Sequence, residues 1–164
     1  MEGSDKTILA GNRIGTNAAG TASLSNGLGG VLIVSGTANL IGTDADGVSD
    51  GLEGNLISGN EGPGISSDGE PVTQTVIAGN IIGAAVGGTS ILANSGAGID
   101  FGNDAKHNRI GGSKAVERNV ISGNEGGGIR ITGAGSVQNW IAGNLIGVDV
   151  AGAVALANGG EGIA

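Results

Sequence analysis

The chain repeats one short polar–apolar pattern along its whole length. In one series of five copies an asparagine stands two residues before an isoleucine and a glycine or serine follows the isoleucine, and every copy keeps both the asparagine and the isoleucine. Residues i and i+2 of a β-strand share a face, so we predict short strands in which both side chains point inward. The asparagines are Asn12, Asn55, Asn80, Asn119 and Asn144, and the isoleucines are Ile14, Ile57, Ile82, Ile121 and Ile146.

A second series of asparagines sets the length of the repeat. Each one stands five residues before an Ile or Val that follows a glycine, and successive members are 34, 34, 30 and 34 residues apart. A fixed period of this size is typical of stacked repeats, so one coil has about 34 residues. The members are Asn26, Asn60, Asn94, Asn124 and Asn158.

A third series predicts another strand in each coil. An Asn or Thr stands two residues before Leu9, Ile41, Ile77, Ile110 and Ile141. β-branched side chains pack well on a pleated surface, and stacked asparagines can satisfy one another in ladders. The predicted fold is therefore all-β, a right-handed parallel β-helix of about five coils with three short strands per coil and no α-helical domain. We expect one domain over residues 1–164.

A longer period of two coils is superimposed on the first. The segment 8–15 recurs at 76–83 and at 140–147, with offsets of 68 and 64 residues. One type of coil has an excursion after its third strand, and the other type has one after its second strand. We expect these excursions to cover the apolar outward residues, and the alternative is a lateral protein interface. The outward residues are Ile8, Leu40, Val76, Arg109 and Trp140 on one strand and Arg13, Leu56, Ile81, Val120 and Leu145 on the next.

Composition and charge narrow the classes of function. The chain has no cysteine, so it has no disulfide and no thiolate metal site. The formal charge of −8 argues against nucleic acid as a partner, and the absence of a long apolar run argues against membrane insertion. Residues 1–4 lack the features of a signal peptide, and we expect them to be a disordered or cloning-derived start.

An acidic stretch is the candidate metal site. Asp44, Asp46 and Asp50 surround Gly47, and closely spaced carboxylates with a turn glycine are typical of calcium loops. The spacing lacks the closing Glu of the twelve-residue pattern, so a solvated Asp-Gly turn is the alternative. No other cofactor is expected.

Asp100 and Arg130 are the candidate catalytic residues. They hold the same outward position in adjacent coils and should face each other across ~4.8 Å. Asp104, Lys106, His107 and Arg109 fall on the nearby turn. The alternative to catalysis is a cross-strand ion pair.

The strings Asn-x-Ile-Gly, Asn-Val-Ile-Ser-Gly-Asn and Asn-x-x-x-Gly-Ile, over residues 5–164, resemble those of right-handed parallel β-helix repeat proteins of bacteria and archaea. The resemblance implies an extracellular or cell-surface location. It is also compatible with two kinds of function: a non-catalytic scaffold of adhesin or stalk type, or a polysaccharide lyase or hydrolase. A glycan- or calcium-binding module is a separate alternative.

The chain begins before a second strand and stops after a first one, without distinctive capping repeats. We therefore expect a piece of a longer solenoid. Possible partners are further copies, through the open ends or the outward apolar residues, and polysaccharide. The scaffold is the preferred interpretation.

Overall fold

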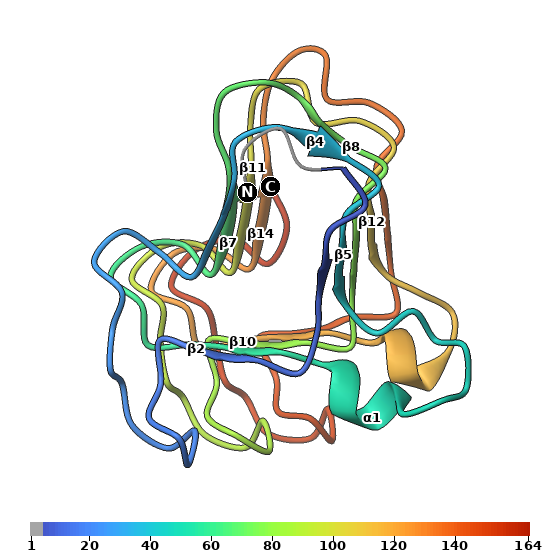
Figure 1. Ribbon diagram of the computed structural model, residues 1–164. Coiled ribbons are helices and arrows are strands. Elements are labelled where there is room, and N and C mark those ends of the chain that lie inside the picture. Colours follow the sequence, from blue (N-terminus) through green and yellow to red (C-terminus); the bar gives the residue numbers. More distant parts are fainter. Residues whose placement is uncertain (1–4) are drawn as a thin grey trace.

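The computed structural model describes residues 5–164, which form a parallel β-solenoid of stacked coils (Figure 1). Three sheets run along it. The first sheet contains β3 (Val31–Ile33), β7 (Ile65–Ser67), β11 (Ile99–Phe101) and β14 (Ile129–Ile131). The second contains β1 (Ile8–Leu9), β5 (Leu40–Gly42), β9 (Val76–Ala78), β12 (Arg109–Gly111) and β15 (Trp140–Ala142). The third contains β2 (Arg13–Ile14), β6 (Leu56–Ile57), β10 (Ile81–Ile82), β13 (Val120–Ile121) and β16 (Leu145–Ile146).

The register of these sheets is the predicted one. All strand pairs within them are parallel, and Ile82 faces Ile57 in the preceding coil and Ile121 in the following one. A shift of one residue would turn the inward isoleucines outward and would break the hydrogen bonds between the inward asparagines, so these two series together fix the register. The prediction of an all-β solenoid with coils of about 34 residues is confirmed.

The predicted number of coils was wrong. The structure has about four coils, because five rungs of a column enclose four turns. The second and third sheets have five strands, but the first sheet has four, and Ile163 joins Ile129 only through an isolated bridge.

Two asparagine columns hold neighbouring coils together inside the solenoid. In both, the Nδ2 of each asparagine donates to the Oδ1 of the next at 2.8–3.0 Å. The second amide hydrogen reaches a backbone carbonyl of the preceding coil, as from Asn80 to Ile41 at 2.8 Å. Buried amides are costly unless they are bonded in this way, so the columns satisfy the core.

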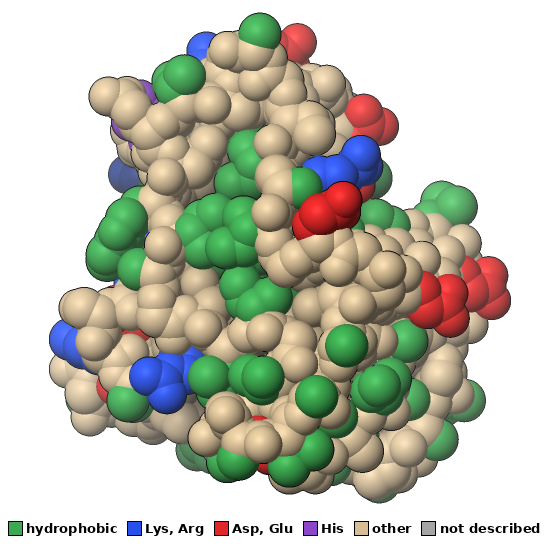
Figure 2. All heavy atoms as spheres, turned by 180° about the vertical axis from the view of Figure 1, so that it is seen from behind, with side chains coloured by type: hydrophobic (Ala, Val, Ile, Leu, Met, Phe, Trp, Pro, Cys, Tyr) green, Lys and Arg blue, Asp and Glu red, His purple; other side chains and the backbone are tan. Residues whose placement is uncertain are grey.

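The apolar core fills the space between the three sheets. Ile57, Ile82 and Ile121 are completely buried, whereas the end rungs Ile14 and Ile146 are only partly covered. Each fully buried isoleucine contributes roughly 1.5–3 kcal/mol. Figure 2 shows hydrophobic side chains gathered at the centre of the end of the solenoid that faces the viewer.

Three long loops, residues 16–25, 84–93 and 148–157, leave the third sheet at alternate coils. Each loop folds back on itself through an antiparallel bridge. Successive loops touch: the Val86 N–H donates to the Gly20 carbonyl and the Val150 N–H to the Gly88 carbonyl, both at 2.9 Å. Two coils span about 10 Å, which is room for a loop two chains thick. This packing explains why the sequence repeats every two coils.

A second kind of loop joins the second and third sheets at the other coils. These loops carry α1 (Asp50–Glu53) and the short 3-10 helix η1 (Ala115–Glu117). They lie side by side at one corner in Figure 1. The Nζ of Lys114 donates to the Ala45 carbonyl at 2.6 Å, so these loops also contact each other across an intervening coil.

The corner between the first and second sheets holds features that the sequence did not reveal. A small parallel sheet joins β4 (Gly36–Thr37) to β8 (Val72–Thr73). One residue of this corner has a left-handed backbone in every coil, with φ between 53° and 58°. In the two coils that contain β4 and β8, it is the residue directly after the strand. These residues are Lys6, Ala38, Gln74, His107 and Gln138. L-residues other than Gly rarely adopt this conformation, so the corner stores strain.

The outward residues of the third sheet are covered more fully than those of the second, where the inner rungs are partly buried and the two end rungs are exposed. On the third sheet, Leu56 and Val120 are buried, and the long loop at Gly20 lies against Leu56. On the second sheet, Ile8 and Trp140 remain 69% and 50% exposed. No helix within residues 5–164 is long and apolar enough to cross a bilayer.

Candidate functional site

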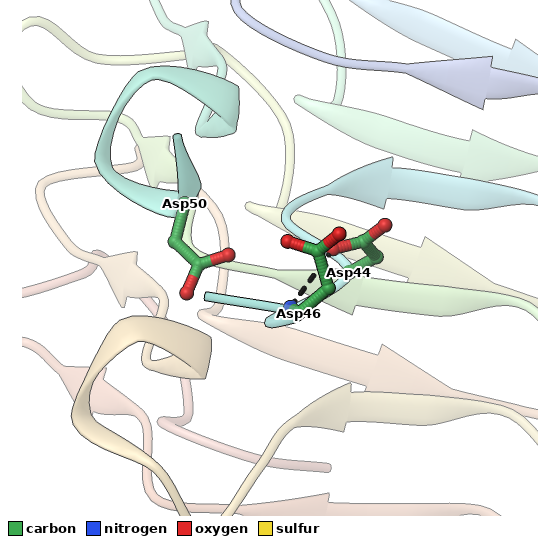
Figure 3. Close-up of side chains that lie close together, drawn as sticks. All are labelled: Asp44, Asp46 and Asp50. Carbon is green, nitrogen blue, oxygen red and sulfur yellow. Dashed lines mark hydrogen bonds between the residues drawn. The ribbon is translucent and has the colours of Figure 1, made fainter. Parts of the chain in front are cut away.

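The acidic loop follows β5 and ends at α1. Figure 3 shows Asp44 and Asp46 close together, with Asp50 approaching from the first turn of the helix. One carboxylate oxygen from each of the three residues lies within 4.8 Å of the others. The structure thus brings together the three predicted metal-site residues.

Hydrogen bonds from the backbone hold this loop in shape. The Asp46 N–H donates to Asp44 Oδ1 at 3.0 Å, and the Val48 N–H donates to Asp46 Oδ1 at 2.7 Å. Asp50 Oδ1 accepts the Thr43 hydroxyl, at 3.3 Å. The carboxylates are therefore oriented by the loop itself, as in Asx turns.

Charge repulsion in this loop is not relieved by an ion pair within residues 5–164. The two ion pairs in that part of the chain involve other carboxylates. Lys114 binds the Ala45 carbonyl and not a carboxylate. Ca²⁺ takes six to eight oxygens, so three aspartates would form one side of a site that water completes. These three side chains are the described residues that could hold a hard cation.

Asp100 and Arg130 face each other on β11 and β14, as the register predicts. They form an ion pair at 2.5 Å, in which the Asp100 side chain is 19% exposed and that of Arg130 is 55% exposed. They border a hollow of about 250 Å³ that is lined mainly by small residues, including Gly96, Gly126 and Gly127.

The pairing governs what Arg130 can do chemically. Its hydrogen bond to Asp100, together with the negative charge, raises the pKa of the guanidinium further above its usual value. A group that stays protonated cannot remove a proton from a substrate. Arg130 can bind an anion but does not fit the role of a general base.

The turn residues near this pair do not converge on it. Asp104 Oδ1 accepts the Gly135 N–H of the next coil at 2.8 Å. The His107 side chain is exposed, and its backbone N–H donates to the Val137 carbonyl at 3.2 Å. Arg109 turns to a different corner. The structure thus disperses these residues instead of assembling a site.

Glu117 is a buried charged residue that the sequence did not single out. It pairs with Arg109 at 2.6 Å, and its Oε2 accepts the Lys114 N–H at 2.8 Å. The Lys114 N–H is the main reason that the pKa of Glu117 lies below its ordinary value, and Arg109 lowers it further, against the effect of burial. This group therefore stays ionised and anchors the loop to the second sheet.

Comparisons with known proteins assign this chain to no family. The chain matches no protein-family model, no curated protein and no solved structure. The β-solenoid and its buried asparagine ladders are established by the geometry alone.

Proposed function

We propose that this chain is a stiff, non-catalytic scaffold segment of an extracellular or cell-surface repeat protein. The unbroken asparagine columns carry the proposal. Each column links every coil to the next through side-chain hydrogen bonds, from Asn12 to Asn144 and from Asn26 to Asn158. These bonds add to the three parallel sheets and resist bending between coils.

The state of the charged groups also favours a scaffold. A general acid or base works best when its pKa is near the operating pH. One side chain in each of the two ion pairs has a pKa that lies further from neutral pH than usual. The pKa of Glu117 is lowered, and the pKa of Arg130 is raised. Both are more firmly ionised, which suits a structural role.

Spin-label distances test the stiffness. The chain has no cysteine, so Ser25→Cys and Ala157→Cys introduce the labelling sites of a pair at equivalent places in the first and third long loops. Four coil spacings separate them by about 19 Å along the axis. We expect a narrow distance distribution, and a broad one would contradict a stiff rod. The same pair in 8 M urea gives the unfolded reference.

An enzyme on polysaccharides is the main rival. Incubation with acidic and neutral polysaccharides, with reducing ends and unsaturated products both measured, separates the two. We expect no turnover, with or without calcium. Turnover that Asp100→Ala and Arg130→Ala abolish would replace the scaffold by an enzyme.

A calcium-binding module is a second candidate function, favoured by the short distances among Asp44, Asp46 and Asp50. Thermal unfolding with and without 5 mM CaCl₂ tests it, because a ligand that binds the folded state raises the melting temperature. Asp46→Asn should abolish the shift, and Asp68→Asn, in an exposed loop elsewhere, should preserve it. No shift in the unsubstituted protein would exclude this candidate.

A further inference from the structure

The chain contains two Asn-Gly dipeptides, and they lie at opposite ends of one asparagine column. They are Asn26-Gly27 and Asn158-Gly159. An asparagine before glycine is prone to lose its amide, because the glycine nitrogen can attack the side-chain carbonyl carbon without hindrance from a Cβ atom. The two dipeptides share this chemistry, so a difference in their reactivity has to come from the fold.

Four hydrogen bonds within residues 5–164 hold the Asn158-Gly159 dipeptide in place. The Oδ1 of Asn158 accepts from both the backbone N–H and the Nδ2 of Asn124, each at 3.0 Å. The Nδ2 of Asn158 donates to the Ile121 carbonyl at 3.0 Å. The Gly159 N–H donates to the Asn124 carbonyl at 2.8 Å. Both the carbonyl that would be attacked and the nitrogen that would attack it are therefore engaged.

The Asn26-Gly27 dipeptide is held far less firmly. Its side-chain amide and its glycine N–H together make one hydrogen bond within residues 5–164, in which Asn26 Nδ2 donates to Asn60 Oδ1 at 2.8 Å. The column is polar, because each Nδ2 donates to the Oδ1 of the next coil, so its first described member receives no bond from the column. Asn26 and Gly27 are also exposed to solvent.

We propose that Asn26 is a site of spontaneous deamidation in the folded protein. The Gly27 nitrogen gives its proton to hydroxide or water and forms a bond to the Cγ of Asn26. The bond from Cγ to Nδ2 then breaks, and this nitrogen takes up a proton and leaves as ammonia. Water opens the resulting five-membered succinimide at either carbonyl, which yields aspartate or isoaspartate at position 26. The reaction needs only water, and no atom is oxidised or reduced.

The hydrogen bonds that must break set the relative rates of the two sites. To close the ring, the Cγ of Asn26 swings toward the Gly27 nitrogen, and this movement breaks one hydrogen bond. The same movement at Asn158 breaks four. Each additional bond lowers the population of the reactive arrangement by a factor of several. We therefore expect Asn26 to react at least tenfold faster than Asn158.

Deamidation removes the bond that joins the first two members of the column. A carboxylate has no N–H, so residue 26 no longer donates to Asn60 Oδ1, and the two oxygens repel each other. Isoaspartate also adds one atom to the backbone, shortly before the Gly30 N–H donates to the Pro63 carbonyl at 3.0 Å. The modification therefore loosens the attachment of the first coil to the second.

Storage of the purified protein at mildly alkaline pH, followed by peptide mapping with mass spectrometry, tests the proposal. We expect conversion at Asn26 to be at least tenfold faster than at Asn158. In 8 M urea the two sites should react at similar rates, because the hydrogen bonds that distinguish them are gone. Equal rates in the folded protein, or an equally large difference in urea, would overturn the proposal.

Gly27→Ala tests the route of the reaction without disturbing the fold. A Cβ at this position meets no atom closer than Glu61 Oε2, at 3.8 Å, and Gly27 does not have a left-handed backbone. The added methyl group hinders the attack of the nitrogen on Cγ. We expect conversion at Asn26 to slow at least tenfold while the melting temperature stays the same. An unchanged rate would refute the succinimide route.

Asn26→Asp supplies one product of the reaction directly and tests its consequence. This variant should melt at a lower temperature than the unsubstituted protein at pH 7. Asn17→Asp is the matched control, because it adds the same charge but keeps the Oδ1 that accepts two backbone N–H groups of its loop. Equal melting temperatures for the two variants would overturn the role assigned to the Asn26 donor.

Discussion

Asn39 and Thr75 occupy neighbouring rungs of one column, and their side chains leave each other unsatisfied. Asn39 Nδ2 and Thr75 Oγ1 are buried and have no hydrogen-bond partner within residues 5–164. Further along the same column, Asn108 Nδ2 donates to Asn139 Oδ1 at 3.0 Å. Threonine at position 75 interrupts this chain of amides, because its side chain offers no carbonyl oxygen at that place.

Thr75→Asn should therefore stabilise the protein. The new Oδ1 would accept from Asn39 Nδ2, and the new amide would continue the column to Asn108. An unsatisfied buried polar group costs about 1–3 kcal/mol, and we expect a gain in unfolding free energy of that order. Urea denaturation measures it. Thr75→Val, which removes only the unpaired hydroxyl, should gain less, and a gain as large as that of Thr75→Asn would refute the role of the amide.

Ala85 is the weak point of the middle long loop. In the other two loops the equivalent residues are Asn17 and Asp149, and each Oδ1 accepts two backbone N–H groups of its own loop. Alanine cannot do this. Ala85→Asn should raise the unfolding free energy by about 1 kcal/mol, the usual value of such a cap. Ala85→Val has similar bulk without the acceptor, and equal melting temperatures for the two variants would contradict the explanation.

Ile82 and Ile81 are consecutive residues of β10 with opposite environments. Ile82 is completely buried, and Ile81 points outward and is partly exposed. Ile82→Asn should cost about 4 kcal/mol or more, because it creates a cavity and buries an unpaired amide. Ile81→Asn should cost far less. Thermal unfolding of both variants checks this, and comparable losses would show that the inward assignment is wrong.

The Glu117–Arg109 pair predicts how stability depends on pH. The pKa of Glu117 is lower in the folded protein than its ordinary value of 4.5. The stability that ionised Glu117 contributes is therefore fully present when the pH is above that ordinary value. It is lost as the pH falls through the pKa of Glu117 in the folded protein. Glu117→Gln should be less stable than the unsubstituted protein at pH 7, and the difference should shrink toward pH 3. A difference that grows on acidification would reverse the sign of this coupling.

The repeated columns were predictable because like residues stack on like residues. The alternation of inward and outward positions fixed both the isoleucine column through Ile82 and the pairing of Asp100 with Arg130. A period-two pattern cannot slip by one residue without exposing the core. The short spacing of Asp44, Asp46 and Asp50 also brought them together in a local turn, as expected.

Other features leave no repeated pattern in the sequence. The left-handed corner is occupied by residues as different as Lys6, Ala38 and His107, because the position constrains the backbone and not the side chain. Contacts between loops are equally hidden: Lys114 reaches Ala45 across 69 residues. The partial exposure of the second sheet depends on where each loop folds, which spacing alone does not determine.

The most direct test of this account is a comparison of two internal duplications. Repeating residues 60–123 adds two coils and keeps the long loops on alternate coils, whereas repeating residues 60–93 adds one coil and places two long loops on adjacent coils. Duplication of the two-coil unit should keep or raise the melting temperature, since added repeats add interfaces. Duplication of the single coil should lower it, because loops two chains thick would be forced to about 4.8 Å spacing. Equal or higher stability of the single-coil variant would contradict the two-coil unit on which the scaffold is built.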